Sequence, residues 1–435
     1  MPTDKNTAPR RVLSMTSMGL NMAGSYIGYL LQRAFLGEER GKSKLKSTHT
    51  RVARRMRNEM QTLRGPIMKL GQTLSLQSSI LPDETIAELA ALQMKAPGMH
   101  PSLVRAQIKG SLGRAPEEIF KSFTPDCFAA ASLGQVHHAV IHDGTQVAVK
   151  IQYPGIGQAI ENDFKLLRAA SLPAQVSRFV PKAAIDELQQ QIVAETDYRR
   201  EAENIEFFET LLAPLPFVTI PHVYREYSSD KVLTMSFLPG RHLEAFLAQR
   251  PPQKLRDQLG THLFELFYFQ LLKMEALHAD PHWGNYLFND DASIGLLDFG
   301  CVKYLRPEAV KYLRRVFLYP GARNSADFVR LIEEYHAPDG KRMSATTRRA
   351  FIDLAERFYR KVYPPEPKNQ QQPFDFSDAG FLREYMRESQ NLVRAKGVMP
   401  EWIFMARAEM GLYQTLHRLG ARVLTSQIVK KYLQD

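Results

Sequence analysis

Cysteine is nearly absent from this 435-residue sequence, which contains only Cys127 and Cys301. So few cysteines exclude a disulfide framework and fit a reducing compartment. The opening residues, MPTDKNTAPRR, are not followed by the leucine-rich core and small-residue cleavage site of a signal peptide, so we expect no secretory signal. With 44% apolar and 24% charged residues, the composition is that of a globular protein with two or three domains or one large bilobal one.

An uncharged run at residues 12–32 lacks the purely apolar composition of a clear membrane span, although it is long enough to cross a bilayer. Its polar residues are Ser14, Thr16, Ser17, Asn21, Ser25 and Gln32. Gly24 and Gly28 form a G-x-x-x-G pair that permits close helix packing, and arginines flank both ends. Three interpretations remain open: a membrane span, a helix at a membrane surface or in self-association, and a soluble helix packed on the protein.

Negative charge is scarce in the first part of the chain. Residues 1–70 contain fourteen Lys/Arg and four Asp/Glu, so they carry +10 of the net charge of +11. A local basic segment indicates an anionic partner, either a membrane surface or a nucleic acid, or else it is a solvated basic tail. We find no aromatic-interleaved RNA motif, which makes a nucleic-acid partner unlikely on sequence grounds.

The pattern of apolar residues divides the chain into four segments, 1–47, 48–118, 119–238 and 239–435. The first is the basic segment with the candidate membrane-associated helix, and the second reads as helices with apolar residues three and four apart. The third changes to strand-like stretches, and its last strands are predicted at Phe217–Val223 and Lys231–Leu238. Pro239-Gly240 then breaks the chain, and the fourth segment is predominantly helical.

Residues 278–300, HADPHWGNYLFNDDASIGLLDFG, carry the strongest chemical signal. Asp280 and Asn285 are five apart, and Asp298 heads an Asp-Phe-Gly turn after an apolar, strand-like run. Two carboxylates and a carboxamide at this spacing can hold Mg²⁺ on a nucleotide and position a hydroxyl for phosphoryl transfer. Asn285 and Asp298 offer oxygens, which suit Mg²⁺, and the carboxylate of Asp280 is able to accept a hydroxyl proton or to orient water.

A phosphate loop and a strand lysine are predicted upstream. Residues 129–136, AAASLGQV, precede a strand, an Asp143-Gly144 hairpin turn and a second strand that ends in Lys150. Lys150 follows Gly134 by sixteen residues, a suitable distance for a lysine that binds the α- and β-phosphates. The predicted nucleotide-contacting residues are Ala129, Ala130, Ala131, Ser132, Gly134, Gln135, Val136 and Lys150.

Glycine is missing where this loop usually has it. In the pattern G-x-G-x-x-G-x-V, Ala129 and Ala131 occupy the first two glycine positions. Glycine lets backbone N–H groups approach a phosphate closely, whereas alanine stiffens the loop and adds methyl groups. We therefore expect a bound nucleotide whose phosphates are placed differently. The alternative interpretation is that these alanines belong to the core of a strand or helix.

His278 and His282 are four apart, a spacing that can bind zinc on a helix. Pro281 lies between them and disfavours a helix, and no third ligand is evident. We predict that both histidines make structural hydrogen bonds.

Together these motifs resemble the UbiB/AarF family of atypical protein-kinase-like proteins, which is associated with ubiquinone (coenzyme Q) biosynthesis. The resemblance runs from about residue 50 to the end of the chain. Two further motifs support it: Lys69-x-Gly71-Gln72, which with the Ala-rich loop separates this family from ordinary kinases, and Glu195-x-Asp197-Tyr198-x-x-Glu201.

The resemblance implies an α+β, bilobal protein-kinase-like fold with an N-terminal helical extension packed over the cleft. It also implies that Lys150 pairs with Glu201 and binds phosphates, and that Lys69 points into the cleft and meets Glu195. By the same resemblance, Asp280 takes the catalytic-base position, with Asn285 and Asp298 as metal ligands. The implied cofactors are ATP or ADP and Mg²⁺. The implied setting is cytoplasmic, peripheral to the inner membrane, with a lipid or quinone precursor as substrate and a homodimer or quinone-biosynthesis enzymes as partners.

A long activation segment is missing after the Asp-Phe-Gly turn. The chain is predicted to be helical by about Pro307, and it has no Ala-Pro-Glu motif. The sequence therefore does not predict a peptide-docking platform. Three functions stay open: an Mg²⁺-dependent atypical kinase or ATPase in quinone biosynthesis, a small-molecule or lipid kinase, and a non-catalytic nucleotide-gated scaffold.

Overall fold

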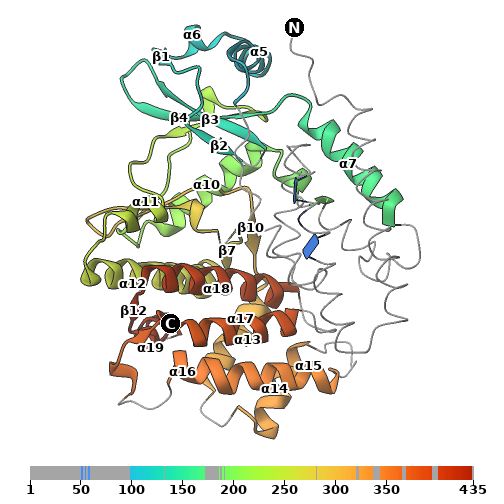
Figure 1. Cartoon of the computed structure of the whole chain (residues 1–435), viewed down its shortest axis with the longest axis vertical. Coiled ribbons are helices and arrows are strands. Elements are labelled where there is room, and N and C mark those ends of the chain that lie inside the picture. The colour runs from blue at the N-terminus through green and yellow to red at the C-terminus, as the bar shows by residue number, and fades with distance from the viewer. Residues whose placement is uncertain are drawn as a thin grey trace. The chain divides into compact units, whose positions relative to one another are not determined.

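The computed structural model of the chain forms two compact units (Figure 1). The first unit comprises Met1–Arg200 and Val223–Phe237, and the second comprises Glu201–His222 and Leu238–Asp435. The structure describes residues 50–51, 54, 57–58, 98–131, 133–171, 186, 189–190, 192–280, 282–319, 323–336, 343–364, 369–393 and 400–433. The segment 12–32, the helical extension around Lys69, and Ser132 lie outside the described residues.

The first unit is built on an antiparallel sheet with strand order β1-β3-β4-β6, and β2 pairs with β3 at one side. Its strands are β1 (Ser122–Phe123), β2 (Ala129–Ala131), β3 (Gly134–Val140), β4 (Gln146–Gln152) and β6 (Val232–Ser236). Its helices include α5 (Pro101–Leu112), α6 (Pro116–Ile119) and α7 (Ile156–Ser171). The predicted turn between β3 and β4 is confirmed: Gly144 has a φ of +95°, which glycine adopts without a steric penalty.

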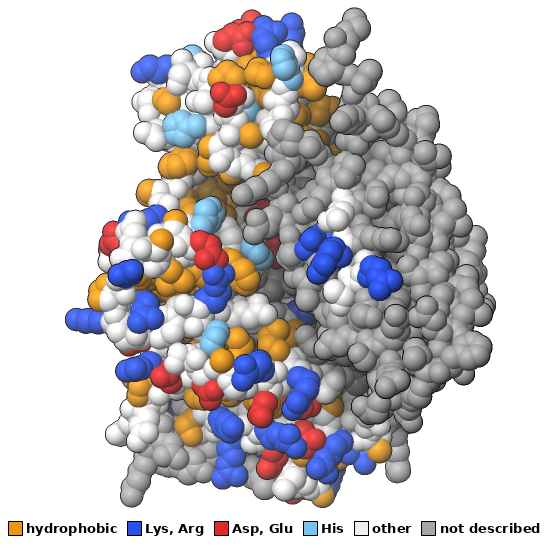
Figure 2. Space-filling model, viewed as in Figure 1, with side chains coloured by type: hydrophobic (Ala, Val, Ile, Leu, Met, Phe, Trp, Pro, Cys, Tyr) orange, Lys and Arg blue, Asp and Glu red, His pale blue; other side chains and the backbone are white. Residues whose placement is uncertain are grey.

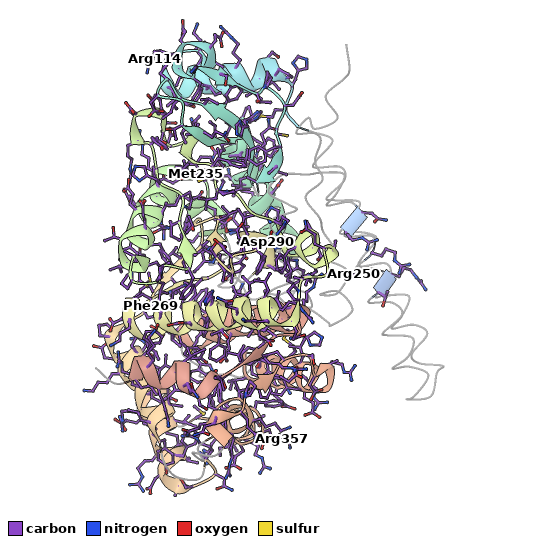
Figure 3. All side chains as sticks on the ribbon, turned by 90° about the vertical axis from the view of Figure 1, so that its left-hand side faces the viewer. Arg114, Met235, Arg250, Phe269, Asp290 and Arg357 are labelled. Carbon is purple, nitrogen blue, oxygen red and sulfur yellow. The ribbon has the colours of Figure 1, made fainter. Side chains whose placement is uncertain are left out.

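One face of this sheet is closed by α5 and α6. Val104 and Ile108 of α5 pack in one core with Val147, Val149 and Ile151 of β4. Side chains alternate between the two faces along a strand, so Ala148 and Lys150 point to the opposite face. On that face Ala148 is paired with His138 on one side and with Met235 of β6 (labelled in Figure 3) on the other. Lys150 is paired with Val136. The predicted nucleotide-contacting side therefore lies away from the α5 core.

The second unit is mainly helical. Its principal helices are α10 (Tyr198–Leu212, whose first three residues belong to the first unit), α11 (Leu243–Ala248), α12 (Gln253–Phe269), α13 (Pro307–Leu318), α14 (Ala326–His336), α15 (Ala345–Leu354), α16 (Arg360–Val362), α17 (Ala379–Val393), α18 (Pro400–Leu419) and α19 (Thr425–Leu433). The core is rich in aromatic side chains, and α18 contacts both α12 and α17. The prediction that a helix begins near Pro307 is confirmed by α13.

Short strand pairs complete the second unit. The pairs are β7 (Ala276–His278) with β10 (Val302–Tyr304), β9 (Ile294–Leu296) with both β5 (Val218–Thr219) and β8 (Tyr286–Phe288), and β11 (Phe374–Asp375) with β12 (Arg422–Val423). One strand prediction needs correction. Phe217–Val223 was expected in the sheet of the third segment, but β5 runs parallel to β9, and only Val223 reaches β6, through a bridge to Met235. The pairing partner of a two-residue strand depends on which strand edge lies beside it in the fold, and the local sequence does not specify that edge.

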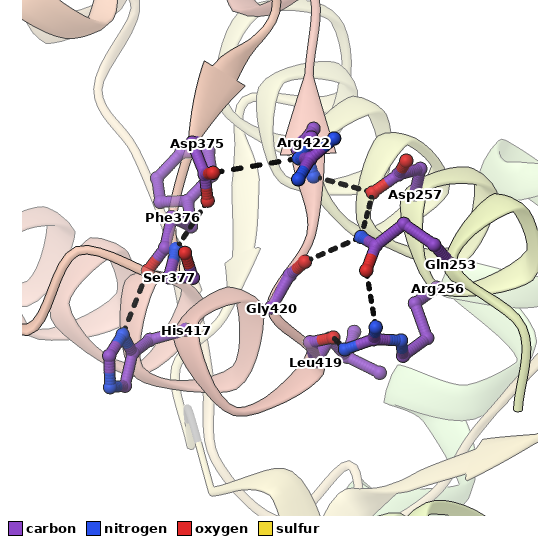
Figure 4. Close-up of polar contacts among 10 residues, drawn as sticks. All are labelled: Gln253, Arg256, Asp257, Asp375, Phe376, Ser377, His417, Leu419, Gly420 and Arg422. Carbon is purple, nitrogen blue, oxygen red and sulfur yellow. Dashed lines mark hydrogen bonds and ion pairs between the residues drawn. The ribbon is translucent and has the colours of Figure 1, made fainter. Parts of the chain in front are cut away.

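The start of α12 is tied to the end of α18 by polar contacts (Figure 4). Gln253 donates to the carbonyl of Gly420 at 2.8 Å, and Arg256 donates to the carbonyl of Leu419 at 2.8 Å. Asp257 accepts from the backbone N–H of Arg422 at 2.8 Å. Gly420 has a φ of +58°, and a Cβ there would lie 2.9 Å from Arg256, so glycine is needed at this turn. These contacts satisfy carbonyls at the C-terminal end of α18.

The surface of the second unit mixes charges of both signs. Figure 2 shows Lys and Arg side chains interspersed with Asp and Glu over its helices. Several form ion pairs, such as Arg315 with Glu334 and Arg349 with Asp353. None of the described helices is long and apolar enough to cross a membrane.

Candidate functional site

The Ala-rich segment forms a strand and not an open loop. Ala129, Ala130 and Ala131 make up β2 and pair with Val136, Gln135 and Gly134 of β3. The hairpin is closed at Gly134, where a Cβ would lie 2.2 Å from the carbonyl oxygen of Ile151 and 2.8 Å from the hydroxyl of Tyr198. Gly134 is therefore required for close packing of the hairpin on β4. The alternative interpretation, that these alanines belong to a strand, describes their conformation, and their contact with a nucleotide stays a prediction.

The side chain of Gln135 has a structural role. It is buried, accepts a hydrogen bond from the backbone N–H of Met99 at 2.7 Å, and lies 2.6 Å from Nε2 of His137. Nδ1 of His137 is 2.9 Å from the carbonyl of Thr124, so this nitrogen donates and Nε2 accepts from Gln135. Burial lowers the pKa of His137, which keeps its ring neutral. Of the predicted loop side chains, Val136 and not Gln135 shares the face of Lys150.

Lys150 is buried in the first unit, with 5% of its surface exposed. Its ammonium lies 5.1 Å from the ring centre of Tyr198, the first residue of α10, which gives a cation–π contact in a desolvated setting. The turn before α10 is fixed to the sheet, because Gln152 of β4 donates to the carbonyl of Thr196 at 2.7 Å and Tyr198 N–H donates to the carbonyl of Asp230 at 3.1 Å.

Two of the predicted carboxylates flank the start of α10. Glu195 lies in the turn before the helix and Glu201 in its first turn, and both are buried. A buried charge is retained in proteins when it is paired and hydrogen-bonded, so a carboxylate at either position calls for such partners. Asp197 is exposed and accepts from the N–H of Arg199 at 3.0 Å, which caps the helix. The pairing of Lys150 with Glu201 stays a prediction.

In the second unit, His278 anchors the candidate catalytic loop. The chain reaches it through α12, which ends at Phe269 (Figure 3) and continues as a π-helical turn, Gln270–Met274. The side chain of Gln270 accepts from the N–H of His278 at 2.8 Å. Nε2 of His278 lies 2.7 Å from the carbonyl of Asp298 and 3.2 Å from that of Leu297, so it donates to the turn that carries the Asp-Phe-Gly motif.

Asn285 is held beside Asp280. The loop makes a 3₁₀ turn, Trp283–Asn285, in which Nδ1 of His282 accepts from Gly284 N–H at 3.0 Å. The side-chain N–H of Asn285 donates to the carbonyl of Asp280 at 3.3 Å. Because the nitrogen of the carboxamide makes this contact, its oxygen points away from the carbonyl of Asp280. Both histidines make the structural hydrogen bonds predicted for them.

Asp298 has an unusual backbone. Its φ of +57° is uncommon for a residue other than glycine, and its Oδ1 accepts from the N–H of Gly300 at 3.1 Å. The next residue, Phe299, is fully buried, with its ring edge-to-face on His278 (5.5 Å) and on Phe208 of α10 (5.2 Å). Such a conformation persists when its surroundings fix it, and it is typical of sites that position a group for a ligand.

The donors of the second unit suit magnesium. Asn285 offers a carboxamide oxygen and Asp298 a carboxylate oxygen, and Mg²⁺ takes one or two such protein ligands together with phosphate oxygens and water. The carboxylate of Asp280 also acts on its surroundings: burial, with a smaller contribution from Asp280, raises the pKa of Tyr286 above its usual range. Among the described residues no group of three or more His, Cys, Asp or Glu side chains forms a metal cluster.

The predicted residues thus fall into two groups. Lys150, Glu195 and the β2–β3 hairpin belong to the first unit, and Glu201, Asp280, Asn285 and Asp298 belong to the second. Lys69 and Ser132 lie outside the described residues. Sequence reasoning quoted Tyr198 as a motif residue without assigning it a role beside Lys150, and it missed Asn204, whose side chain contacts Phe299. The only sequence signal for them was their place in the motif helix around Glu201.

A strand lysine in an antiparallel sheet unit, and an Asp-x4-Asn loop with an Asp-Phe-Gly turn in a helical unit, define the class of atypical kinase-like proteins. Residues 91–331 match the model of the ABC1 atypical kinase-like domain. The match covers more than half of the chain, and the chain belongs to this family. The resemblance drawn from the motifs and the α+β kinase-like fold are therefore confirmed.

Several curated proteins are similar to the chain. The atypical kinase COQ8 of Saccharomyces cerevisiae mitochondria is 32% identical over 276 residues, which are 62% of this chain and 54% of that protein. The chloroplastic protein ACTIVITY OF BC1 COMPLEX KINASE 7 of Arabidopsis thaliana is 32% identical over 63% of this chain and 40% of its own length. The uncharacterized protein sll1770 of Synechocystis is 29% identical over 84% and 65%. The chain thus spans less than two thirds of each of these relatives.

A solved structure shares the fold. The complex of Rv3197 with erythromycin from Mycobacterium tuberculosis superposes with a TM-score of 0.60 at 27% sequence identity. The similarity covers 85% of this chain and 92% of that one.

Proposed function

We propose that the protein is an Mg²⁺-dependent atypical kinase or ATPase. The observation that supports this most directly is the backbone conformation of Asp298, a strained conformation that His278 holds by a hydrogen bond to the Asp298 carbonyl. Asp298 comes directly after the chain segment that lies beside Asn285. The backbone N–H of Leu297 donates to the carbonyl of Asn285 at 2.8 Å, so the two proposed metal ligands are joined through neighbouring main chain. Family membership supports the kinase-like class.

The proposed chemistry is positioning and charge neutralisation, because a transferring phosphoryl group spreads its negative charge over several oxygens. Lys150 supplies a positive charge for the nucleotide phosphates, and its contact with Tyr198 restrains the flexible side chain. Asn285 and Asp298 would hold Mg²⁺, which when bound would supply positive charge against the phosphate oxygens. Asp280 accepts the proton of a hydroxyl or orients water.

Three further assignments rest on the family resemblance. Glu201 would pair with Lys150, and Lys69 would meet Glu195, which places a second lysine at the nucleotide. The β2–β3 hairpin with its three alanines would cover the phosphates. The burial of Glu195 and Glu201 supports both pairings, since each needs a cationic partner.

The proposed setting is isoprenoid-quinone biosynthesis at a membrane surface. Support comes from the relative named COQ8 in yeast, and from the basic residues 1–70, which favour an anionic surface. ATP turnover would drive the handling of lipid precursors or the assembly of biosynthetic enzymes, with the protein peripheral to the inner membrane.

A second candidate is direct phosphorylation of a small molecule or lipid. It is favoured by the short connection after Gly300: β10 pairs with β7, and α13 begins at Pro307. This connection leaves no long segment for a peptide substrate to dock on. A nucleotide-gated scaffold without turnover is the remaining alternative from the sequence.

ATP turnover by the purified full chain separates these functions. We expect turnover that is stimulated by anionic liposomes or a phenolic quinone-precursor mimic, and that falls on the order of 10²–10³-fold in Asp298→Asn, since this change removes a preorganised charged group. Asp291→Asn is a matched control, because Asp291 makes a similar hydrogen bond to the N–H of Ser293 in the same unit.

The outcomes are distinct. Phosphate found on the lipid or mimic would favour the second candidate, and free phosphate alone would favour the ATPase. Nucleotide binding without turnover by the wild-type chain would leave the scaffold. Equal turnover in Asp298→Asn and wild type would overturn the assigned site.

A further inference from the structure

The turn that carries Asp298 is held at two successive carbonyl groups. His278 donates to the carbonyl of Asp298 at 2.7 Å, and the side-chain N–H of Asn204 donates to the carbonyl of Phe299 at 2.9 Å. These contacts fix the two peptide planes that follow the Cα atoms of Asp298 and Phe299. Because Asp298 has a φ of +57°, a conformation that costs about 1–3 kcal/mol, its surroundings must hold it in place.

Asn204 is itself oriented from a second side. The residue is 5% exposed, and its side-chain oxygen accepts a hydrogen bond from the hydroxyl of Tyr304 at 3.0 Å. A hydroxyl on one side and a carbonyl on the other assign the amide unambiguously, with oxygen toward Tyr304 and nitrogen toward Phe299. The ring of Tyr304 packs edge-to-face on Phe207, the third residue after Asn204 in α10, at 5.4 Å.

The two partners of Asn204 lie in the Asp-Phe-Gly turn and directly after it. Phe299 lies within it, and Tyr304 ends β10, the strand that follows it. Asn204 comes from α10, far away in the sequence, three residues after Glu201 and therefore on the same side of the helix. One helix thus carries both the carboxylate proposed to pair with Lys150 and the amide that holds the metal-binding turn.

We propose that Asn204 is a positioning residue for the metal site, and that Tyr304 orients it. Asn204 acts through the backbone of Phe299 to keep the carboxylate of Asp298 in place for Mg²⁺, so the metal requirement of nucleotide binding depends on how α10 holds this turn. The inference rests on the proposed function and adds a residue that touches neither nucleotide nor metal.

The test measures the Mg²⁺ concentration needed for half-maximal binding of a fluorescent ATP analogue to the full chain. Asn204→Asp keeps the size of the side chain but replaces the donor with a carboxylate facing a carbonyl. We expect it to raise the Mg²⁺ requirement roughly 10-fold or more, the effect of losing a partner that orients a metal ligand. Tyr304→Phe removes only the hydroxyl and is expected to give a smaller increase of the same kind.

Asn289→Ser is the matched control, because Asn289 is a half-buried asparagine of the same unit whose side-chain N–H donates to Ser293 at 3.1 Å. Binding without Mg²⁺ is measured in parallel, and we expect it to be unchanged in all variants. A purely structural role for Asn204 would lower the melting temperature and leave the Mg²⁺ requirement at the wild-type value, which would overturn the proposal.

Amide hydrogen exchange tests the same contact without any nucleotide. Exchange across residues 297–304 should accelerate in Asn204→Asp and stay unchanged in Asn289→Ser. If the wild-type chain shows no Mg²⁺-dependent nucleotide binding, the proposed function fails, and the metal role of Asn204 fails with it. If the wild type binds and Asn204→Asp matches it in both Mg²⁺ requirement and exchange, only the positioning role is overturned.

Discussion

Asp298 and Glu409 are both carboxylates of the second unit, and the structure holds them in opposite ways. Glu409 of α18 is 2% exposed, and its two oxygens accept from five tyrosine hydroxyls, at Tyr268, Tyr359, Tyr363, Tyr385 and Tyr413. A carboxylate has about four acceptor sites, so these donors saturate it. Asp298 is only partly buried, and it is held largely through backbone carbonyls and a strained φ.

The difference separates a structural acid from a candidate functional one. The tyrosines around Glu409 come from α12, α17, α18 and the segment 359–363, so the acid joins parts of the helical core that are distant in sequence. Asp298, in contrast, is held through its main chain, which directs its side chain without surrounding the carboxylate. The carboxylate of Asp298 can therefore bind a ligand, whereas that of Glu409 cannot.

Removing Glu409 is expected to have the largest effect on stability. Glu409→Ala leaves five buried hydroxyls without their common acceptor and opens a cavity, so we expect the free energy of unfolding to fall by roughly 3–5 kcal/mol. Urea unfolding measures this change. Asp298→Asn should alter the same quantity by less than about 1 kcal/mol, and equal losses in the two variants would remove the distinction between the two regions.

The pH dependence of stability sharpens the comparison. Burial raises the pKa of Glu409 above its usual 4.5, against the opposing effect of the tyrosine hydrogen bonds. The folded state therefore binds this proton more tightly than the unfolded chain, so the contribution to stability grows as pH falls through the folded-state pKa and is lost as pH rises through it.

Glu409→Gln isolates this contribution, because glutamine cannot titrate. We expect the free energy of unfolding of the wild type to gain on that of Glu409→Gln as pH falls toward the ordinary carboxyl pKa of 4.5, by at most about 1.4 kcal/mol per pH unit. The tyrosines stay protonated throughout, since burial raises their pKa values as well. A difference that shrinks as pH falls would show that the pKa of Glu409 is lowered.

The smallest expected effect concerns the β2–β3 hairpin. Ala129→Gly or Ala131→Gly makes the strand more flexible and removes a methyl group, and we expect a several-fold change in the ratio of ATP to ADP affinity. Both affinities are measured by nucleotide titration. Ala130 lies between the two glycine positions of the loop pattern, so Ala130→Gly adds flexibility to the same strand without restoring either glycine, and comparison with it separates the two effects. Unchanged affinities for both nucleotides in both variants would count against a role of these alanines.

Local signals predicted the conformation of several segments. The Asp280–Asn285 spacing, the turn at Asp298 and the start of α13 at Pro307 depend on residues close in sequence, and the structure bears out their local conformation. The kinase-like fold followed from the same motifs. The placement of β5 beside β9 was not predicted, because a two-residue strand contains too little pattern to select a partner.

The long-range contacts could not be predicted. Asn204 meets Phe299 across 95 residues, and Tyr268 meets Glu409 across 141. Neither pair has a periodicity or motif that joins its members, since side-chain hydrogen bonds depend on how whole helices pack. The tyrosines of the Glu409 cluster look like ordinary core aromatics in the sequence, and their shared acceptor becomes evident only in three dimensions.

The most direct test of the metal site is calorimetric titration of ATP, with and without Mg²⁺, into the wild type, Asp298→Asn and Glu409→Gln. We predict that Mg²⁺ tightens ATP binding in the wild type and in folded Glu409→Gln, and that Asp298→Asn loses this gain while keeping its Mg²⁺-free affinity. An Asp298→Asn chain that keeps the full Mg²⁺ effect would contradict the assignment of Asp298 as a metal ligand.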